Sequence, residues 1–497
     1  MTTTAPRQKP RAAASHFAKT LLGAALVSTA LAVAPIAPAH AFAAPESFAD
    51  LVEQVKPAVV MITTSTVVTE PAGGMPGFPP GSPFEEFFKE FGMPNMPGQG
   101  PQGPARPHRS DALGSGFVIS EDGYIVTNNH VIENADEISI EFANGTKLDA
   151  KLVGTDPKTD IALLKVESDK PLPFVSFGDS DTMREGDWVM AMGNPLGQGF
   201  STSVGIVSAR NRELSGTYDD YIQTDAAINR GNSGGPLFNT SGKVIGVNTA
   251  IMSPNGGSIG IGFSMASNVV SKVVGQLKEF GATRRGWLGV KIQDVTPDMA
   301  EAMSLSAPEG VMVSDVPDGP AKEAGMQSGD VIVSFDGNPV KDSKELVRRV
   351  ADAPVGEAVR VVVMRGGKEQ TLLVTLGQRE LAEGSDGSDD GGKATPGGSD
   401  GEVLGMTLSP LSDQLRSELN LPSGMIGLVV TDVDESSESF DKGLRKGDVI
   451  VEAGQQPVLS VGDLEARVSE AKEGGRKSVL LLIRRGGEPR FVAVPID

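Results

Sequence analysis

The chain has 497 residues, a formal net charge of −20 and no cysteine. The negative charge opposes binding to the phosphates of nucleic acids, and the lack of cysteine excludes disulfides, thiolate metal sites and cysteine-linked lipids. At about 150 residues per domain, the length predicts about three domains, each with a well-formed core.

Residues 1–41 have the pattern of a secretory signal peptide. A basic start and an apolar run over residues 21–34 precede a small-residue cleavage site at residues 39–41 (AHA). Cleavage after Ala43 and a retained anchor are the alternatives, but the apolar run is shorter than the roughly 20 residues that a membrane span needs. We therefore expect export and no stable membrane span.

The next segments alternate between regular structure and a long insert. From Phe48 the sequence predicts a short helix, followed by a strand over residues 58–64. Residues 70–112 are rich in Pro and Gly and are predicted to form a long mobile loop. Four phenylalanines within residues 83–91 predict either docking on a partner subunit or on the active site, or a local hydrophobic cluster.

Residues 114–270 consist of short runs rich in Val, Ile, Thr and Phe. Turn signals such as residues 144–145 (NG) and 241–242 (SG) separate these runs, and a helical pattern appears only at residues 266–280. This predicts an all-β barrel or sandwich, large enough for two packed barrels, which ends in an amphipathic helix.

The chain contains four histidines: His16, His40, His108 and His130. Signal cleavage removes the first two, and His108 lies in the Pro/Gly-rich insert. His130 follows the strand-like residues 124–128, which would give a general base a rigid platform. A structural role is the alternative for this histidine.

Ser233 lies in a glycine-rich turn, residues 231–235 (GNSGG). The turn fits the nucleophile elbow of an α/β-hydrolase, the glycine-flanked serine of a chymotrypsin-like protease, or an ordinary turn without chemistry. A serine nucleophile needs a neighbouring base, and no histidine follows Ser233 in the chain. The α/β-hydrolase order of Ser, Asp and His is therefore excluded, whereas the chymotrypsin order of His, Asp and Ser is possible.

The chymotrypsin order requires a carboxylate between His130 and Ser233 to orient the imidazole. Asp160 is the best candidate because it directly precedes an apolar, strand-like run, residues 161–166 (IALLKV). The other acidic candidates in the segment lie in more polar surroundings: Asp136, Asp149 and Asp169.

The C-terminal part of the chain contains an internal repeat. Residues 324–333 (AGMQSGDVIV) recur as residues 442–451 (KGLRKGDVIV), and residues 288–290 (LGV) match residues 404–406 (LGM). Each copy is a whole domain, predicted at residues 283–379 and 403–497. Residues 380–402 between them contain mainly Gly, Ser, Asp and Glu, and are predicted to be a flexible linker.

These segments together resemble the Deg/HtrA serine proteases, in which one or two PDZ domains follow a trypsin-like domain. The matching segments are residues 127–131 (TNNHV), 159–165 (TDIALLK) and 228–237 (INRGNSGGPL), and the resemblance spans nearly the whole mature chain. It implies a mainly β protein with a chymotrypsin-like double β-barrel protease domain at residues 42–282. Two PDZ domains follow, each an α+β unit with a small, partly open barrel.

The resemblance also implies catalytic roles. Ser233 would attack the peptide carbonyl, His130 would transfer the proton, and Asp160 would orient His130. Backbone N–H groups of Gly231 and Ser233, with that of Asn232 as a further candidate, would form the oxyanion hole. No metal or cofactor is needed for this chemistry.

Further residues match binding and regulatory positions of the family. The walls of the specificity pocket would be Ile228, Ile251 and Met252, which predicts cleavage after small aliphatic residues such as Val or Ala, with structural packing as the alternative. A regulatory loop between Ala209 and Tyr218 would contain Arg212 as a sensing arginine. The turns that bind a C-terminal carboxylate in the two PDZ domains, or are simply tight structural turns, would contain Leu288, Gly289 and Val290, and Leu404, Gly405 and Met406.

We therefore expect an ATP-independent serine endopeptidase of the periplasm that degrades misfolded exported proteins. Its expected partners are unfolded polypeptides, exposed C-terminal peptides and further copies of itself, as a trimer or a multiple of one. The alternatives are a chaperone or peptide-binding protein in which proteolysis is minor, and a PDZ scaffold with an inactive protease domain. The scaffold is disfavoured because all three triad residues are present.

Overall fold

The computed structural model describes residues 45–68, 108–194, 199–214, 216–229, 231–252, 257–382, 400–419, 421 and 425–496. The predicted signal peptide, the phenylalanine-rich segment and most of the predicted linker lie outside the described residues. Within these residues, no helix combines the length and the apolar character that crossing a membrane requires.

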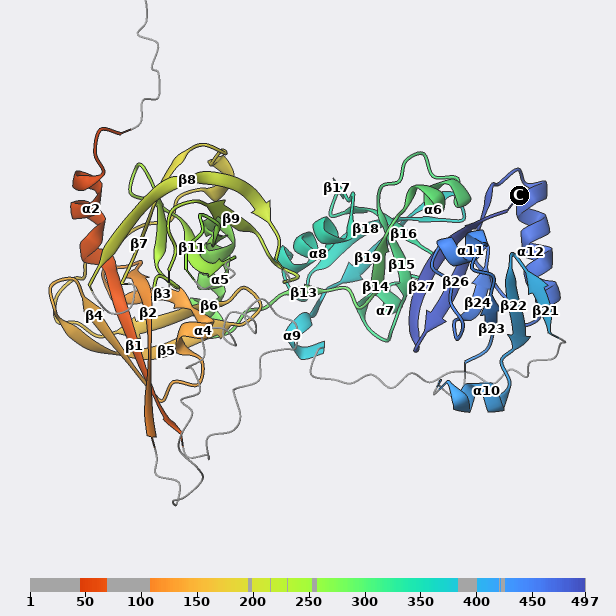
Figure 1. The fold of residues 1–497 in the computed structure, drawn as a ribbon, viewed down its shortest axis with the longest axis horizontal. Helices are drawn as coiled ribbons and strands as arrows, with labels where there is room; N and C mark the ends of the chain where they lie inside the picture. Colours follow the sequence, from red (N-terminus) through yellow and green to blue (C-terminus); the bar gives the residue numbers. More distant parts are fainter. Residues whose placement is uncertain are drawn as a thin grey trace, which may run out of the picture. The chain divides into compact units, whose positions relative to one another are not determined.

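The first barrel follows the short helix α2 (Ala49–Val55) and the turn η1 (Lys56–Ala58). Its six strands close in the order β1-β2-β3-β6-β5-β4. Their bounds are β1 (Val59–Val68), β2 (His108–Val118), β3 (Tyr124–Asn128), β4 (Glu137–Phe142), β5 (Lys147–Asp156) and β6 (Ile161–Val166). Figure 1 shows these strands in red to orange.

The predicted insert extends too far at its C-terminal end. Residues 108–112 belong to β2 and pair with the second half of β1, with His108 opposite Val68. The predicted strand at residues 58–64 is correspondingly longer, because the end of β1 finds its partner on the far side of the insert.

The second barrel also has six strands, closed in the order β10-β11-β12-β9-β8-β7. Its strands are β7 (Trp188–Gly193), β8 (Ser201–Arg212), β9 (Tyr221–Thr224), β10 (Pro236–Asn239), β11 (Val244–Ile251) and β12 (Gly262–Ala266). The short helix α4 (Asn129–Ile132) lies between β3 and β4, and η2 (Ser180–Thr182) precedes β7. Helix α5 (Ser267–Phe280) follows the barrel, as the sequence predicts, and ends at Gly281 with φ of 72°.

Each C-terminal repeat contains an antiparallel sheet with helices. The first has a sheet in the order β14-β15-β16-β18-β19 and a separate pair of β13 and β20. Its elements are β13 (Gly286–Trp287), β14 (Lys291–Asp294), α6 (Pro297–Ala302), β15 (Val311–Asp315), α7 (Pro320–Glu323), β16 (Val331–Phe335), β17 (Asn338–Pro339), α8 (Ser343–Asp352), β18 (Ala358–Arg365), β19 (Lys368–Thr375), β20 (Gly377–Gln378) and α9 (Arg379–Ala382).

The second repeat has a sheet in the order β21-β22-β23-β24-β26-β27. Its elements are β21 (Gly401–Val403), β22 (Met406–Pro410), α10 (Asp413–Glu418), β23 (Leu428–Val433), α11 (Glu438–Asp441), β24 (Val449–Ala453), β25 (Gln456–Pro457), α12 (Val461–Glu473), β26 (Ser478–Arg485) and β27 (Glu488–Pro495). Helix α9 and strand β21 occupy the two ends of the predicted linker, and residues 383–399 lie outside the described part of the chain.

The repeated sequence motif encodes a repeated ion pair. The buried carboxylate of Asp330 lies 2.6 Å from Arg365, and that of Asp448 lies 2.7 Å from Arg485. Each carboxylate also accepts a backbone N–H at 2.9 Å, from Gln327 in the first repeat and from Arg445 in the second. A buried carboxylate needs such partners, which explains why both copies contain the Gly-Asp sequence and a distant arginine.

Candidate active site

His130 lies at the start of helix α4, directly after strand β3. Its Nδ1 is 2.6 Å from Oδ2 of Asp160, and its backbone N–H donates to Oδ1 of the same carboxylate at 2.9 Å. Both side chains are 9% exposed. A carboxylate bound to Nδ1 favours the tautomer with hydrogen on Nδ1, which leaves Nε2 to accept a proton.

Asp160 lies in the turn between β5 and β6, with a φ of 55°. This left-handed conformation is uncommon for residues other than glycine but is tolerated by Asp and Asn. Its backbone carbonyl accepts the N–H of Asn129 at 3.0 Å and Nδ2 of Asn128 at 2.8 Å. Contacts to both backbone and side chain therefore hold Asp160 beside His130.

A buried ion pair adjoins this turn and was not predicted from the sequence. Nη2 of Arg285 lies 2.5 Å from Oδ2 of Asp156, and their side chains are 7% and 2% exposed. The same Oδ2 accepts the hydroxyl of Thr159, the residue before Asp160. The signal available in the sequence was a second acidic residue four positions before Asp160, but its partner lies far away in the chain.

The turn that contains Ser233 packs against the end of β3. Gly231 and Gly234 have φ of 89° and 83°. A side chain at Gly234 would collide with the carbonyl of Ser115 and the hydroxyl of Thr127, and would approach the backbone nitrogen of Asn128 to 3.0 Å. The glycine is therefore needed both for its conformation and for this approach, which brings the Ser233 turn to the strand that precedes His130.

The backbone of the turn already uses one of the predicted oxyanion donors. The N–H of Asn232 donates to the carbonyl of Asn229 at 3.0 Å, and the carbonyl of Asn232 accepts the N–H of Gly235 at 2.9 Å. The first contact directs the Asn232 N–H into the turn. Of the three predicted donors, those of Gly231 and Ser233 fit the role better.

The three residues predicted to line the specificity pocket have different surroundings. Ile228 is buried in the core of the second barrel, and Ile251 packs against the same core. Met252 has 54% of its surface exposed. The structure therefore brings two of the three together and gives Ile228 a packing role as well.

Arg212 is the last residue of strand β8 and lies opposite Tyr221 of β9 in a bulged part of the ladder. Its side chain is exposed. The segment from Ala209 to Arg212, which was predicted to be a loop, is therefore strand, because its backbone pairs with β9.

Tyr221, opposite Arg212, is buried. This burial, together with the charges of Asp219 and Asp160, raises the pKa of the Tyr221 hydroxyl well above the usual value.

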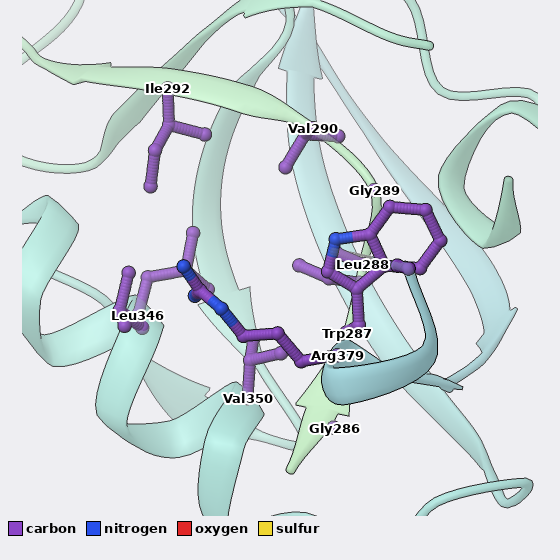
Figure 2. A pocket seen from close by; sticks show the side chains of 11 residues that line it. Gly286, Trp287, Leu288, Gly289, Val290, Ile292, Leu346, Val350 and Arg379 are labelled. Atoms are coloured by element: carbon purple, nitrogen blue, oxygen red, sulfur yellow. The ribbon is translucent and has the colours of Figure 1, made fainter. Parts of the chain in front are cut away.

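A groove of about 210 Å³ lies in the first C-terminal repeat. Figure 2 shows Leu346 and Val350 of α8 on one side of it, with Val290 and Ile292 opposite them. The predicted carboxylate-binding turn forms one end, with Gly289 at φ of 77°. Among the described residues β14 is the edge strand of its sheet, so a peptide could add beside it.

The corresponding turn of the second repeat differs. Leu404 and Gly405, with φ of 54° and 72°, form a two-residue hairpin turn in which Val403 of β21 pairs with Met406 of β22. Val403 is 8% exposed and packs in the core with Leu464 of α12. Strand β21 thus occupies the edge of β22 that corresponds to the open edge of β14.

Across the part of the chain that the structure describes, no group of three or more His, Asp and Glu side chains is arranged to hold a metal ion.

Comparisons with known protein families match both halves of the chain. The profile of the trypsin-like peptidase domain matches residues 114–247. The profile of the PDZ domain matches twice, at residues 257–376 and 402–496. These matches confirm the predicted fold class, a mainly β chain with a double-barrel domain followed by two PDZ domains.

Several curated proteins and solved structures are similar over much of the chain. A probable periplasmic serine endoprotease, described as DegP-like, from Brucella suis is 43% identical over 477 residues, which covers 90% of each chain. A similarly described protein from Bartonella henselae is 42% identical over 464 residues, with 91% of this chain and 90% of that protein covered. The solved structure of the HtrA-type protease AlgW with a decapeptide is 38% identical, covers 67% of this chain and 99% of that chain, and has a TM-score of 0.56.

Proposed function

Because the chain belongs to the HtrA family of trypsin-like serine endoproteases with PDZ domains, we propose that it degrades misfolded exported proteins without ATP, using His130, Asp160 and Ser233. The observation that carries this proposal is the pairing of His130 with Asp160 next to the glycine-rich turn of Ser233. The imidazole, its orienting carboxylate and a serine on a tight turn are the three parts that acyl transfer by a serine requires.

In the proposed mechanism, Nε2 of His130 takes the proton of the Ser233 hydroxyl as its oxygen attacks the substrate carbonyl. Asp160 stabilises the imidazolium that forms, through the 2.6 Å contact to Nδ1. The protonated His130 then donates to the leaving amine, and water hydrolyses the acyl-enzyme in a second cycle of the same proton transfers. No metal or cofactor takes part in this scheme.

The oxyanion of the tetrahedral intermediate would accept the backbone N–H groups of Gly231 and Ser233. The engagement of the Asn232 N–H within the turn supports this choice of two donors. Loss of one such donor typically costs about 2.7–4 kcal/mol of transition-state stabilisation.

Cleavage after small aliphatic residues is supported by the aliphatic side chains of Ile228 and Ile251, since neither provides a charge to pair with Lys or Arg.

The groove of the first PDZ repeat is the proposed recruiting site for exposed C-terminal peptides. Its apolar walls suit an aliphatic last residue, and the turn at Gly289 suits a carboxylate. The second repeat is proposed not to accept such peptides, because β21 already pairs with the edge of β22. One chain would therefore bind one peptide.

We further propose a periplasmic location and assembly into a homo-oligomer, as a trimer or a multiple of one. The location is supported by the signal-like residues 1–41 and by relatives named as periplasmic endoproteases. The oligomer rests on the family resemblance, and light scattering of the purified protein tests it directly.

The function is tested by incubating the purified protein and its Ser233→Ala variant with casein, an unfolded substrate. We expect the unmodified protein to degrade casein, and the variant to be slower by about 10⁶-fold because it lacks the nucleophile. Intact casein with both proteins, or equal degradation by both, would contradict the proposal. Suppression of casein aggregation by the variant would add a chaperone activity.

A further inference from the structure

Ser115 lies in the C-terminal half of β2, between Gly114 and Gly116, and its side chain is completely buried. It faces the Ser233 turn, although the two are far apart in the sequence. Its backbone N–H donates to the carbonyl of Ser233 at 2.9 Å. The first barrel therefore holds the nucleophile loop of the second barrel through this residue.

The hydroxyl of Ser115 makes two further contacts on the same side of the turn. It donates to the carbonyl of Gly231, and it accepts the N–H of Asn194, the residue directly after β7, at 2.9 Å. The Ser115 carbonyl in turn accepts the hydroxyl of Thr127 at 2.7 Å. The N–H, the hydroxyl and the carbonyl of Ser115 are thus all hydrogen-bonded, to the Ser233 turn or to residues beside it.

The surroundings leave little space for a different arrangement. A side chain at Gly193 would approach the hydroxyl oxygen of Ser115 to 2.9 Å, and one at Gly235 would approach its Cβ to 3.2 Å. Substitution of Ser115 by a larger residue would therefore displace the Ser233 turn. Without a donor at this position, the Gly231 carbonyl would lose the hydrogen bond that the Ser115 hydroxyl supplies in a buried site.

The contact bears on the oxyanion hole because it holds the peptide plane between Gly231 and Asn232. The carbonyl of this plane is bound to Ser115, and its N–H is bound to the Asn229 carbonyl at 3.0 Å. The next plane is held by Gly235, which donates to the Asn232 carbonyl at 2.9 Å. The Gly231 N–H belongs to the preceding peptide plane, and the Gly231 dihedral angles, with φ at 89°, set its direction relative to the held plane. Glycine rotates freely about these bonds, so contacts that hold the plane restrict the direction of the N–H.

We propose that Ser115 is a positioning residue for the oxyanion hole, which holds Gly231 so that its N–H is directed at the oxyanion beside that of Ser233. This inference rests on the proposed proteolytic function. Ser115 does not touch the substrate, so its removal should weaken binding of the transition state and leave ground-state binding of the peptide unchanged.

The test uses Ser115→Ala in the full chain, which removes the hydroxyl and adds no bulk. We expect kcat for a fluorogenic peptide to fall by about 10-fold to 100-fold with KM unchanged, a smaller loss than the 10²-fold to 10³-fold typical of losing a donor itself. A peptide aldehyde, whose adduct with Ser233 places an oxygen in the hole, should bind more weakly by the same factor. A non-covalent product peptide should bind as before.

Ser267→Ala is the matched control, because Ser267 is also completely buried and its hydroxyl donates to a backbone carbonyl, that of Gly178, at 2.7 Å. It should leave kcat unchanged even if it lowers the melting temperature by a similar amount. An unchanged kcat in Ser115→Ala, or a fall in kcat with unchanged aldehyde affinity, would overturn the proposal. Failure of the proteolytic function itself would appear separately, as activity that is absent from the unmodified protein or retained in Ser233→Ala.

Discussion

At the scale of single residues, Asp160 depends on contacts to both its backbone and its side chain. Its φ of 55° disfavours most side chains, and hydrogen bonds from Asn128, Asn129 and the backbone of His130 hold it in place. Asparagine tolerates the same backbone conformation as aspartate. A substitution that removes the charge alone can therefore separate chemistry from folding.

Asp160→Asn is expected to lower kcat by about 10⁴-fold, because an amide neither stabilises the imidazolium nor selects the productive tautomer. Steady-state kinetics on a fluorogenic peptide measures the effect, and thermal unfolding monitors the fold. Asp149→Asn is the control, since Asp149 is an exposed acidic residue of β5 in the same stretch of sequence. A comparable loss of kcat in the control would remove Asp160 from the triad.

Glu452 of β24 provides a prediction on pH and stability. Burial raises the pKa of its carboxyl, and the charge of Arg484 opposes the shift. The folded state then favours the protonated acid, so this residue's contribution to stability is present below the unfolded pKa of about 4.3 and is lost as pH rises through the higher folded value.

Replacement of Glu452 by Gln removes this titration. We expect the variant to have a larger free energy of unfolding than the unmodified chain at pH 7, with the difference shrinking toward pH 4. Urea unfolding of both proteins across this range measures it. Parallel curves for the two proteins would show that Glu452 does not titrate differently on folding.

At the scale of elements, the edge strands distinguish the two PDZ repeats. Helices α8 and α12 begin after equivalent capping residues, Asp342 and Ser460, and bury equivalent leucines, Leu346 and Leu464. The residue after each leucine differs, however. Val347 lines the groove of the first repeat, whereas the second repeat has Glu465, an acid that would repel a C-terminal carboxylate.

Val347→Glu transfers this feature of the second repeat to the first. In a Ser233→Ala background, a labelled peptide with an aliphatic C-terminus should bind at one site per chain. Val347→Glu should lower the affinity for this peptide by about 10-fold or more through charge repulsion, a factor that corresponds to 1.4 kcal/mol. Leu373→Glu, on an exposed position of β19, should leave the affinity unchanged. Fluorescence anisotropy gives both affinity and stoichiometry, and two equivalent sites would contradict the assignment.

The sequence predicted local features of these elements better than their pairings. Helix α5, the barrels and the repeat follow from periodicity, turn residues and an internal match within short windows. The prediction of His130, Asp160 and Ser233 used the glycine-rich turn, the chain order, the strand after Asp160 and the family resemblance. The pairing of residues 108–112 with β1, the strand at Arg212 and the hairpin of β21 depend on which strand edge is available after folding, and no short segment contains that information.

At the scale of the whole molecule, the Arg285–Asp156 pair connects the segment that starts the first PDZ repeat with the turn beside Asp160. Arg285 also donates its backbone N–H to Glu380 at 3.1 Å, and its carbonyl accepts the N–H of Arg379 at 2.9 Å. The side chain and backbone of Arg285 thus join three distant parts of the sequence. A buried carboxylate that loses its partner is strongly destabilising.

Arg285→Ala is expected to lower the free energy of unfolding of the protease domain by about 3–5 kcal/mol, the usual effect of breaking a buried ion pair. Differential scanning calorimetry of the full chain measures the shift. Arg284→Ala is the neighbouring control, because Arg284 is exposed and stacks on Phe280 at the surface. Equal shifts in both variants would show that the buried pair has no special effect.

The position of Arg285 also bears on how the molecule can be divided in the laboratory. The predicted protease domain ends at residue 282, so a recombinant fragment with that end would contain Asp156 without its cation. A chimera that exchanges PDZ modules at residue 282 would place another protein's residue against Asp156. Fragments and fusions of this enzyme should therefore be joined beyond residue 285, with the arginine kept as part of the protease unit.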